Sequence, residues 1–324
     1  MHGFHSIGTG SGMGFRVGTG AIAAAVLLAL VAAFALTTPA TAQTITTLGS
    51  GFRAPLGVAV DSAGNVYVAD EVNNDVKRIA AVDGAVTTIG SGFRNPSGVA
   101  VDSAGNVYVA DALNNAVRQI PAGGGAVTTL GSGFDRPFGV AVDSAGNVYV
   151  ADLNNRAVKR IAAVDGAITT LGSGFNAPRA VAVDSAGNVY VAELNYSEVM
   201  RIAAVDGAVT TLASGFDRPR GVAVDSAGNV YVADSNNNAV KRIAAVDGAV
   251  TTIGSGFNSP RAVAVDSAGN VYVGDTGNSA VKKLTFAPPA PAPIPTLSEW
   301  AMILMGLMLA GGAALYIQRR QMIA

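Results

Sequence analysis

The chain has 324 residues, 40 of them glycine, and a formal net charge of −1. This balance argues against a protein that follows the phosphate backbone of nucleic acid, because such proteins usually carry a strongly basic face. There is no cysteine, and the two histidines, His2 and His5, lie at the extreme N-terminus. Disulfides, thiolate chemistry and histidine-based catalysis are therefore excluded for the rest of the chain.

The first 42 residues are predicted to form a signal peptide. Arg16 precedes a run of small and apolar residues that extends from Ala21 to Leu36. Ala40 and Ala42 then fit the A-x-A pattern at which signal peptidase cleaves. An uncleaved N-terminal membrane anchor is the alternative, and either kind of segment would export the rest of the chain.

Residues 43–286 are built from a repeat. The stretch DSAGNVYVA begins at residue 61 and recurs at 102, 143, 184 and 225, and DSAGNVYVG follows at 266, so that the period is 41 residues. A period of this size, with short runs rich in β-branched residues, is typical of a β-propeller. Each unit offers four strand candidates, which in the first unit are residues 57–60, 65–69, 76–80 and 85–89. The sequence therefore predicts an all-β, six-bladed β-propeller with four-stranded blades.

The two ends of the repeat predict a closed ring. A TTL or TTI stretch occurs at residues 46, 87, 128, 169, 210 and 251, but none follows the sixth unit, which ends at Phe286. The first stretch, residues 44–49, is therefore expected to be the outer strand of the last blade. Pairing of the two ends would leave no open sheet edge where the ring closes.

The repeated DSAGN segment could be a turn or a calcium loop. A calcium loop needs more oxygen ligands in one short segment than Asp61, Ser62 and Asn65 supply. Gly64 instead stands where a tight turn needs positive φ, and Asp61 can accept a backbone N–H two residues further on. We therefore expect six turns and predict no metal or other cofactor.

The repeat unit itself points to a family. The pattern PxGVAVDSAGNVYVADxxNNxVKRI resembles the NHL repeat, and the resemblance extends over residues 43–286. It implies a six-bladed propeller of a kind that mostly binds proteins, glycans or RNA, although a few relatives are enzymes.

Two loops vary among the six copies, namely the FxxPx loop and the loop after VAD. Because strands alternate in direction, both loops should emerge on one face of the ring, and rigid scaffolds usually carry recognition on such loops. The residue after the proline should line the mouth of the central channel, and the series is Leu56, Ser97, Phe138, Arg179, Arg220 and Arg261. Three adjacent arginines suit a carboxylate, sulfate or phosphate group. The alternative is that they pair with acidic residues of neighbouring loops, such as Asp217 or Glu193.

The fourth unit departs most from the repeat. Glu193 replaces the aspartate of VAD, and Tyr196, Ser197, Glu198 and Met200 replace the usual asparagine-rich pattern. An exposed tyrosine beside two carboxylates would suit contact with a sugar or a peptide. Drift in a tolerant surface loop is the alternative.

The C-terminal region is predicted to anchor the chain. Residues 287–295 are rich in proline and alanine and should form an extended linker. Residues 301–317 are apolar and uncharged and are predicted to be a transmembrane helix. Arg319 and Arg320 follow this helix, and by the positive-inside rule they should lie in the cytoplasm.

The motif before this helix points to a second family. Ile294, Pro295, Thr296, Leu297 and Trp300, followed by the helix and the arginine pair, resemble an IPTL-type C-terminal sorting signal of Gram-negative bacteria over residues 294–321. The resemblance implies an inner-membrane anchor, recognition by an exosortase-like transpeptidase and transfer to the cell surface. Ala301 departs from the pattern, in which glycine usually follows the tryptophan. A plain membrane anchor with a proline-rich stalk is the alternative.

The leading hypothesis is a non-catalytic surface protein that presents one propeller face to a glycan, to matrix or to a protein, with an acidic glycan or a protein as its ligand. A structural surface-layer or spacer protein is the first alternative, since the blades are nearly identical. A lyase-like or lactonase-like propeller enzyme is the second. The lyases rely on histidine and the lactonases hold a metal with Glu, Asn and Asp, and no matching constellation can be traced here.

Overall fold

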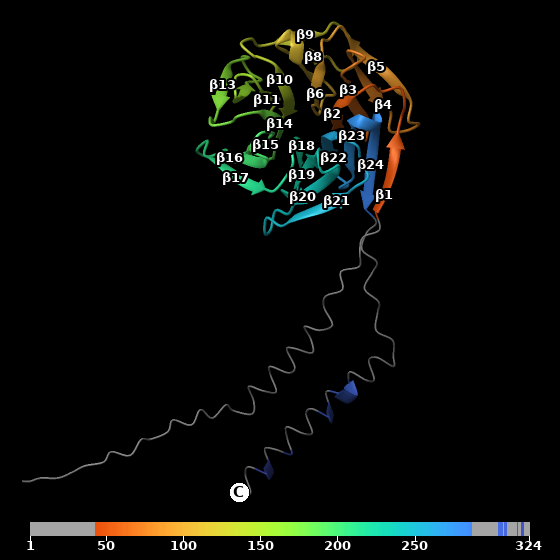
Figure 1. Ribbon diagram of the computed structural model, residues 1–324, viewed down its shortest axis with the longest axis vertical. Coiled ribbons are helices and arrows are strands. Elements are labelled where there is room, and N and C mark those ends of the chain that lie inside the picture. Colours follow the sequence, from red (N-terminus) through yellow and green to blue (C-terminus); the bar gives the residue numbers. More distant parts are fainter. Residues whose placement is uncertain (1–42, 287–303, 307, 310–315, 317–318, 321–324) are drawn as a thin grey trace, which may run out of the picture. The chain divides into compact units, whose positions relative to one another are not determined.

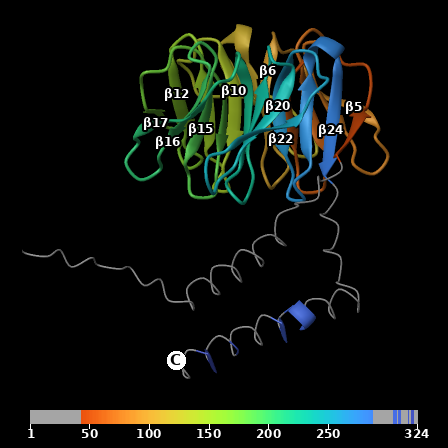
Figure 2. The same cartoon turned by 60° about the horizontal axis from the view of Figure 1, so that its bottom comes forward.

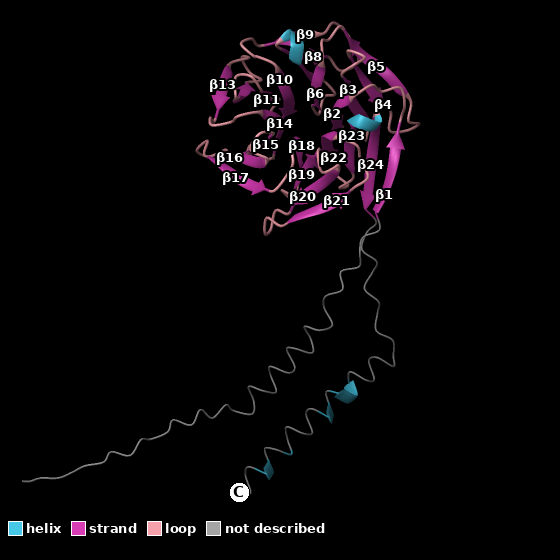
Figure 3. Cartoon of the chain, in the orientation of Figure 1, coloured by secondary structure: helices cyan, strands magenta, loops and turns pink. Residues whose placement is uncertain are grey.

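The propeller forms a closed ring of six sheets. The computed structural model describes residues 43–286 together with residues 304–306, 308–309, 316 and 319–320. Within residues 43–286, six antiparallel sheets of four strands each surround a central axis (Figure 1). Strands dominate this region, and two short 3-10 helices interrupt the loops (Figure 3). The prediction of an all-β, six-bladed propeller with four-stranded blades is confirmed.

Each blade consists of four strands ordered from the axis outward. The first three blades are β2 (Pro55–Val60), β3 (Val66–Asp70), β4 (Asp75–Ile79) and β5 (Val86–Ser91); β6 (Pro96–Val101), β7 (Val107–Asp111), β8 (Ala116–Ile120) and β9 (Thr128–Leu130); and β10 (Pro137–Val142), β11 (Val148–Asp152), β12 (Ala157–Ile161) and β13 (Ile168–Leu171). The helix η1 (Ala112–Asn114) lies between β7 and β8.

The remaining blades follow the same order. They are β14 (Pro178–Val183), β15 (Val189–Glu193), β16 (Glu198–Ile202) and β17 (Val209–Ser214); β18 (Pro219–Val224), β19 (Val230–Asp234), β20 (Ala239–Ile243) and β21 (Val250–Gly254); and β22 (Pro260–Val265), β23 (Val271–Asp275), β24 (Ala280–Phe286) and β1 (Gln43–Leu48). The helix η2 (Thr276–Asn278) lies between β23 and β24.

The first strand closes the ring, as predicted. β1 pairs antiparallel with β24, with a register that runs from Gln43 opposite Phe286 to Leu48 opposite Val281. The two strands lie side by side in Figure 1. Every sheet in the described propeller is therefore complete, and the sixth blade joins the first and last parts of the repeat.

Small residues let the innermost strands approach closely around the axis. A Cβ atom on Gly57 of β2 would lie 2.7 Å from the carbonyl oxygen of Ser97 on β6, and one on Gly98 would lie 2.5 Å from that of Phe138. Such distances are shorter than real contacts allow. Blades four and six accept alanine at this position, as Ala180 and Ala262.

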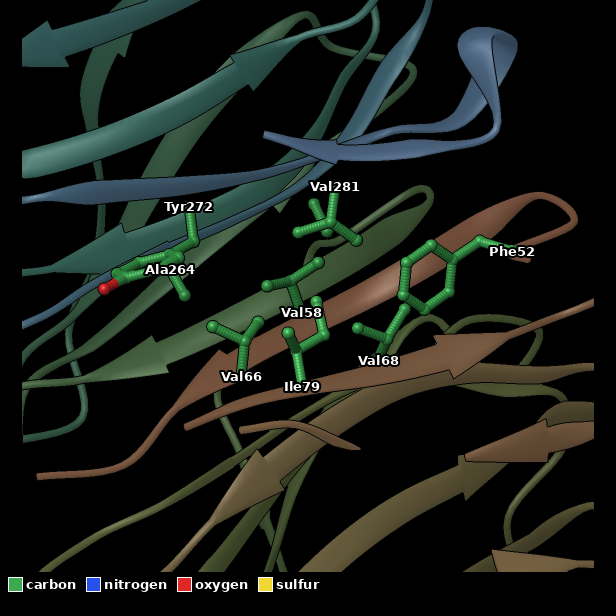
Figure 4. Packing of buried hydrophobic residues seen from close by; sticks show 9 residues of the cluster. Phe52, Val58, Val66, Val68, Ile79, Ala264, Tyr272 and Val281 are labelled. Carbon is green, nitrogen blue, oxygen red and sulfur yellow. The ribbon is translucent and has the colours of Figure 1, made fainter. Parts of the chain in front are cut away.

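The core lies between neighbouring blades. Figure 4 shows the interface of the first and last blades, where Phe52, Val58 and Val68 pack against Tyr272 and Val281. Equivalent clusters fill the other five interfaces. The second strand of each blade is buried on both faces, which explains why its apolar residues do not alternate with polar ones.

The DSAGN segments are turns, as predicted. The Asp61 carboxylate accepts the N–H groups of Ala63 and Asn65 at 3.0 and 2.8 Å, the Asn65 side-chain amide at 2.8 Å and the Tyr67 hydroxyl at 3.0 Å. Gly64 has φ +85°. The same bonds recur in the other five copies, so each of these carboxylates is surrounded by donors from its own turn.

The remaining described residues belong to the C-terminal region and are helical. Arg319 and Arg320 are exposed there. No helix in the described part of the chain is long and apolar enough to cross a membrane. The predicted helix over 301–317 falls largely outside the described residues. So do the signal peptide with Ala40 and Ala42, the linker over 287–295, and the motif residues from Ile294 to Trp300.

Candidate functional site at the channel mouth

Both variable loops of each blade lie on one face, as predicted. In the first blade the N–H of Glu71, in the loop between β3 and β4, donates to the carbonyl of Ala54, in the loop before β2, at 3.3 Å. On the other face the DSAGN turn meets the turn between β4 and β5, where the N–H of Ala81 donates to the side-chain oxygen of Asn65 at 3.0 Å. We call these the variable face and the constant face. Figure 2 shows the propeller from the side, with loops on its two opposite faces.

Six side chains line a pocket on the axis at the variable face. Each is the first residue after the proline that begins an innermost strand. The regular pairing with the second strand shifts at this point, in the first blade between Pro55 and Gly57, which leaves the residue between them free to turn toward the axis. The six, which we call the mouth ring, are Leu56, Ser97, Phe138, Arg179, Arg220 and Arg261. The sequence predicted this ring.

One half of the mouth ring is apolar and closed. Leu56 and Phe138 are buried. Ser97 is buried too, and its hydroxyl donates to the carbonyl of Phe138 at 2.9 Å. This half therefore adds no charge to the mouth and exposes little surface.

The other half carries three guanidinium groups. The Cζ atom of Arg179 lies 3.4 Å from the centre of the Phe138 ring, within the range of a cation–π contact. The Nε atoms of Arg220 and Arg261 are buried without a hydrogen-bond partner. Over residues 43–286, no ion pair joins any of these three arginines to a carboxylate. The alternative in which Asp217 or Glu193 neutralises them is therefore not what the structure shows.

The three charges act on one another. Burial, repulsion by Arg220 and Arg261, and a further contribution from Arg136 lower the pKa of Arg179 to about 9, against a partial opposing effect of Glu71. Burial and the nearby Arg261 and Arg218 lower the pKa of Arg220 to about 10. A bound anion would relieve this repulsion and could accept several charged hydrogen bonds.

A buried carboxylate ties each pair of variable loops together. In the first blade Asp70 is fully buried. One of its oxygens accepts the N–H of Arg53 at 2.7 Å, and the other accepts the Asn73 side chain at 2.7 Å and the Lys77 ammonium at 2.5 Å. Blades two, three, five and six repeat this arrangement around Asp111, Asp152, Asp234 and Asp275. We call it the carboxylate clasp.

The fourth blade has a different clasp, because Glu193 replaces the aspartate. The prediction that Glu193 belongs to an exposed contact patch is wrong. Glu193 is 0 % exposed, so it cannot belong to a surface contact patch. Its carboxylate turns inward and accepts the N–H groups of Asn176 and Ala177 at 3.1 and 2.5 Å. Tyr196 and Met200 stand where other blades have the asparagine and the cation of the clasp. Burial raises the pKa of Glu193, although these backbone hydrogen bonds oppose the rise.

The other predicted residues of this blade do lie at the surface. Tyr196 is 48 % exposed. Glu198 is half-buried and accepts the hydroxyl of Thr211 at 2.9 Å. The carboxylate clasp was not predicted from the sequence, although its residues recur at fixed spacing. Aspartate, asparagine and a cation recur at spacings of three and four residues in five units, and all three change together in the fourth.

Two family models match this chain, one in the propeller and one in the C-terminal region. The NHL repeat matches residues 52–79, 93–120, 134–161, 216–243 and 257–284. The unmatched unit is the fourth blade, which has the altered clasp. The IPTL-CTERM motif matches residues 292–321, which include the predicted sorting residues and the arginine pair. Both predicted resemblances are confirmed. No match was found among curated proteins.

Solved structures share the fold at low sequence identity. A protein of unknown function from Bacteroides thetaiotaomicron is 20% identical with a TM-score of 0.65, and the match covers 76% of each chain. A gluconolactonase from Xanthomonas campestris is 19% identical with a TM-score of 0.65 and covers 75% of this chain and 90% of its own. A streptogramin B lyase is 13% identical with a TM-score of 0.59 and covers 75% of this chain and 98% of its own. At these identities the likeness concerns the fold alone.

Proposed function

Because this chain is an NHL-repeat β-propeller that carries an IPTL-CTERM motif, we propose that it is an exported binding protein, sorted to the cell surface, whose variable face recognises an anionic ligand. The observation that carries the proposal is the cluster of Arg179, Arg220 and Arg261 at the channel mouth, which no carboxylate of the described residues neutralises. The binding role is non-catalytic.

The cluster favours a ligand that brings its own charge. Partly buried cations without a counter-ion are unfavourable, because desolvation and mutual repulsion both act against them. Carboxylate, sulfate and phosphate groups match the planar fork of a guanidinium group. Leu56 and Phe138 complete the mouth ring and leave only a small apolar surface beside the carbon skeleton of such a ligand. An acidic glycan combines both features, and an acidic protein segment is the second source of the same chemistry.

The topology favours presentation of this face. β24 begins after η2 on the variable face and runs to Phe286 at the constant face, and β1 begins opposite it at Gln43. Both chain segments that flank the propeller are therefore attached at the constant face. We propose that the linker, the membrane helix and the sorting signal follow from there, with signal peptidase and an exosortase-like enzyme as processing partners. The mouth then points away from the point of attachment.

The enzyme alternative has less support from the site. The names of the lyase and the gluconolactonase raise it, but the likeness to them is limited to the fold. An enzyme mouth needs a group for acid–base chemistry or a metal site. The mouth ring consists of three arginines, Leu56, Ser97 and Phe138, which suit binding better than proton transfer.

The test is a glycan array that pairs each acidic glycan with its neutral counterpart. We expect the wild-type chain to bind acidic members, and the triple variant R179A/R220A/R261A to lose at least about tenfold in affinity, since each charged hydrogen bond is worth about 1.5–3 kcal/mol.

The matched control is the triple variant R53A/R94A/R156A. It removes the same number of charges from exposed positions of the same face. Equal losses in the two variants would show unspecific attraction and reject the mouth as the site. Absence of binding by the wild-type chain would favour a structural surface-layer role.

A further inference from the structure

The fourth blade differs from the others at three linked positions, and the difference lies directly beside the mouth. We propose that Glu193 is a positioning residue that holds Arg179 across the channel mouth for the anion. This inference deepens the proposed function and depends on it for its ligand. Glu193 itself is fully buried and lines no part of the pocket, so it acts through the loop that precedes Arg179.

The first step concerns which hydrogen-bond donors each of the two carboxylate oxygens accepts. In the other five blades one oxygen is occupied by the asparagine and the cation of the clasp, which leaves the second for a single backbone N–H. In the fourth blade Tyr196 and Met200 supply neither group, and the partly buried Met200 packs against the core cluster that contains Phe175. Both oxygens of Glu193 are thereby free for the N–H groups of Asn176 and Ala177. The extra methylene of glutamate provides the reach.

The second step is the shape of the loop. The residue two positions before the mouth residue has positive φ in the other five blades, as Ala54, Asn95, Arg136, Arg218 and Ser259 at 49–59°. Ala177 is the equivalent residue, and it is not in the left-handed region. Its N–H points to Glu193 instead. The altered clasp therefore imposes a different backbone path immediately before Pro178 and Arg179.

The third step is the outcome at the mouth. The Cζ atom of Arg179 lies 3.4 Å from the centre of the ring of Phe138, its neighbour in the mouth ring, whereas Arg220 and Arg261 have no aromatic neighbour in that ring. Those two arginines follow loops with the ordinary aspartate clasp and positive φ. The altered loop path at Ala177 thus lies two residues before the arginine that contacts Phe138.

The test restores the ordinary clasp with the triple variant E193D/Y196N/M200K. Every residue introduced already occupies the equivalent place in the fifth blade, as Asp234, Asn237 and Lys241, so we expect the variant to fold. The full-length chain, solubilised with detergent, is used throughout. We expect the affinity for inorganic sulfate to fall about tenfold, as for loss of one charged hydrogen bond. The variant gains a positive charge, so unspecific electrostatics predicts the opposite change.

A cycle with R179A separates positioning from a general effect on the structure. If Glu193 acts through Arg179, the three substitutions should add little to the loss that R179A causes alone. Additive losses, or unchanged sulfate affinity in E193D/Y196N/M200K while R179A binds less tightly, would overturn the inference.

A second measurement does not depend on the ligand. The nuclear magnetic resonance signal of the Arg179 guanidinium should carry a ring-current shift from Phe138, which should disappear in E193D/Y196N/M200K and in F138L. Persistence of the shift in the restored clasp would reject positioning by Glu193. If R179A leaves sulfate binding unchanged, the proposed function fails, while this signal still decides whether Glu193 places Arg179.

Discussion

At the scale of single residues, the hydrogen bond between Asp61 and Tyr67 recurs in all six blades. Burial alone would raise the pKa of the Asp61 carboxyl, but the hydrogen bonds from Asn65, Tyr67 and Ala63 outweigh it and hold that pKa below its usual value. Burial, and then the hydrogen bond to Asp61, raise the pKa of Tyr67 to about 12. Each partner therefore favours the protonation state that keeps the bond.

The tyrosines should make the propeller sensitive to alkali. Burial and the aspartate partner also raise the pKa of Tyr108, Tyr149, Tyr190 and Tyr231 to about 12, from the ordinary value of 10.0. A phenol with a raised pKa contributes its full stability below pH 10 and loses it as the pH rises through 12. We expect the thermal unfolding temperature to fall over this interval, together with the appearance of phenolate absorbance. Complete ionisation near pH 10 in a folded chain would contradict this.

The aspartates should act at the acid end. Because the folded-state pKa of Asp61 lies below 3.8, its contribution is complete above that pH and is lost as the pH falls through the folded-state value. We expect Asp61→Asn to lower the free energy of unfolding by about 1–3 kcal/mol at neutral pH. The difference from wild type should shrink in acid. Urea unfolding of the wild type and of Asp61→Asn, at neutral and at acid pH, measures this difference in the free energy of unfolding. A difference that does not depend on pH would show that the charge of Asp61 is unimportant.

At the scale of elements, the strand that closes the ring has the least covalent support. β1 pairs with β24 across the whole of its length, but no turn joins the two strands. In the second blade, by contrast, a short hairpin connects β9 to its partner β8. The two outer strands carry the same TTL sequence, which provides a matched comparison.

Proline at equivalent positions should therefore have unequal effects. Proline removes a backbone donor from a strand. We expect Thr46→Pro in β1 to destabilise the chain by about 1–3 kcal/mol, and to lower Tm by about 2–4 °C for each kcal/mol. Thr128→Pro in β9 should cost less, because the hairpin keeps the strand in place. Calorimetry gives both values, and equal effects would mean that closure adds nothing to stability.

Several features of these elements could be read from the sequence. The 41-residue period, the β-branched runs and the missing last TTL stretch define the blades and their closure, because local pattern and strand order determine them. The innermost strand of the first blade, β2, begins two residues earlier than predicted, at Pro55, because Pro55 pairs with the clasp residue Asp70. The burial of Glu193 could not be predicted, since it depends on backbone N–H groups that lie 16 and 17 residues away.

At the scale of the whole molecule, the two faces of the propeller differ in the parts of the chain that they carry. The constant face holds both flanking segments, at Gln43 and Phe286, and the variable face holds the mouth. The chain has no natural cysteine, so a single introduced cysteine can report which face is accessible on cells. Val72 on the variable face is 47 % exposed and Val164 on the constant face is 98 % exposed.

On intact cells, a cysteine at position 72 should therefore be labelled more readily, relative to the purified chain, than a cysteine at position 164. We expect Val72→Cys to react faster than Val164→Cys with a bulky maleimide on intact cells, once each rate is divided by the rate for the purified chain. The reason is that the attachment point shields the constant face. Equal ratios would mean that the propeller turns freely on its linker, and the reverse order would contradict the proposed presentation.

The pairing of β1 with β24 also determines when the propeller can finish folding. β1 begins at Gln43 and is synthesised before every other strand, whereas its partner ends at Phe286 and is synthesised after all the rest. Contacts between such distant parts of a chain form slowly. β1 therefore has no partner until the last repeat has been made, and under the proposed export until that repeat has crossed the membrane. Throughout this interval the first strand and the last sheet are both open to wrong partners.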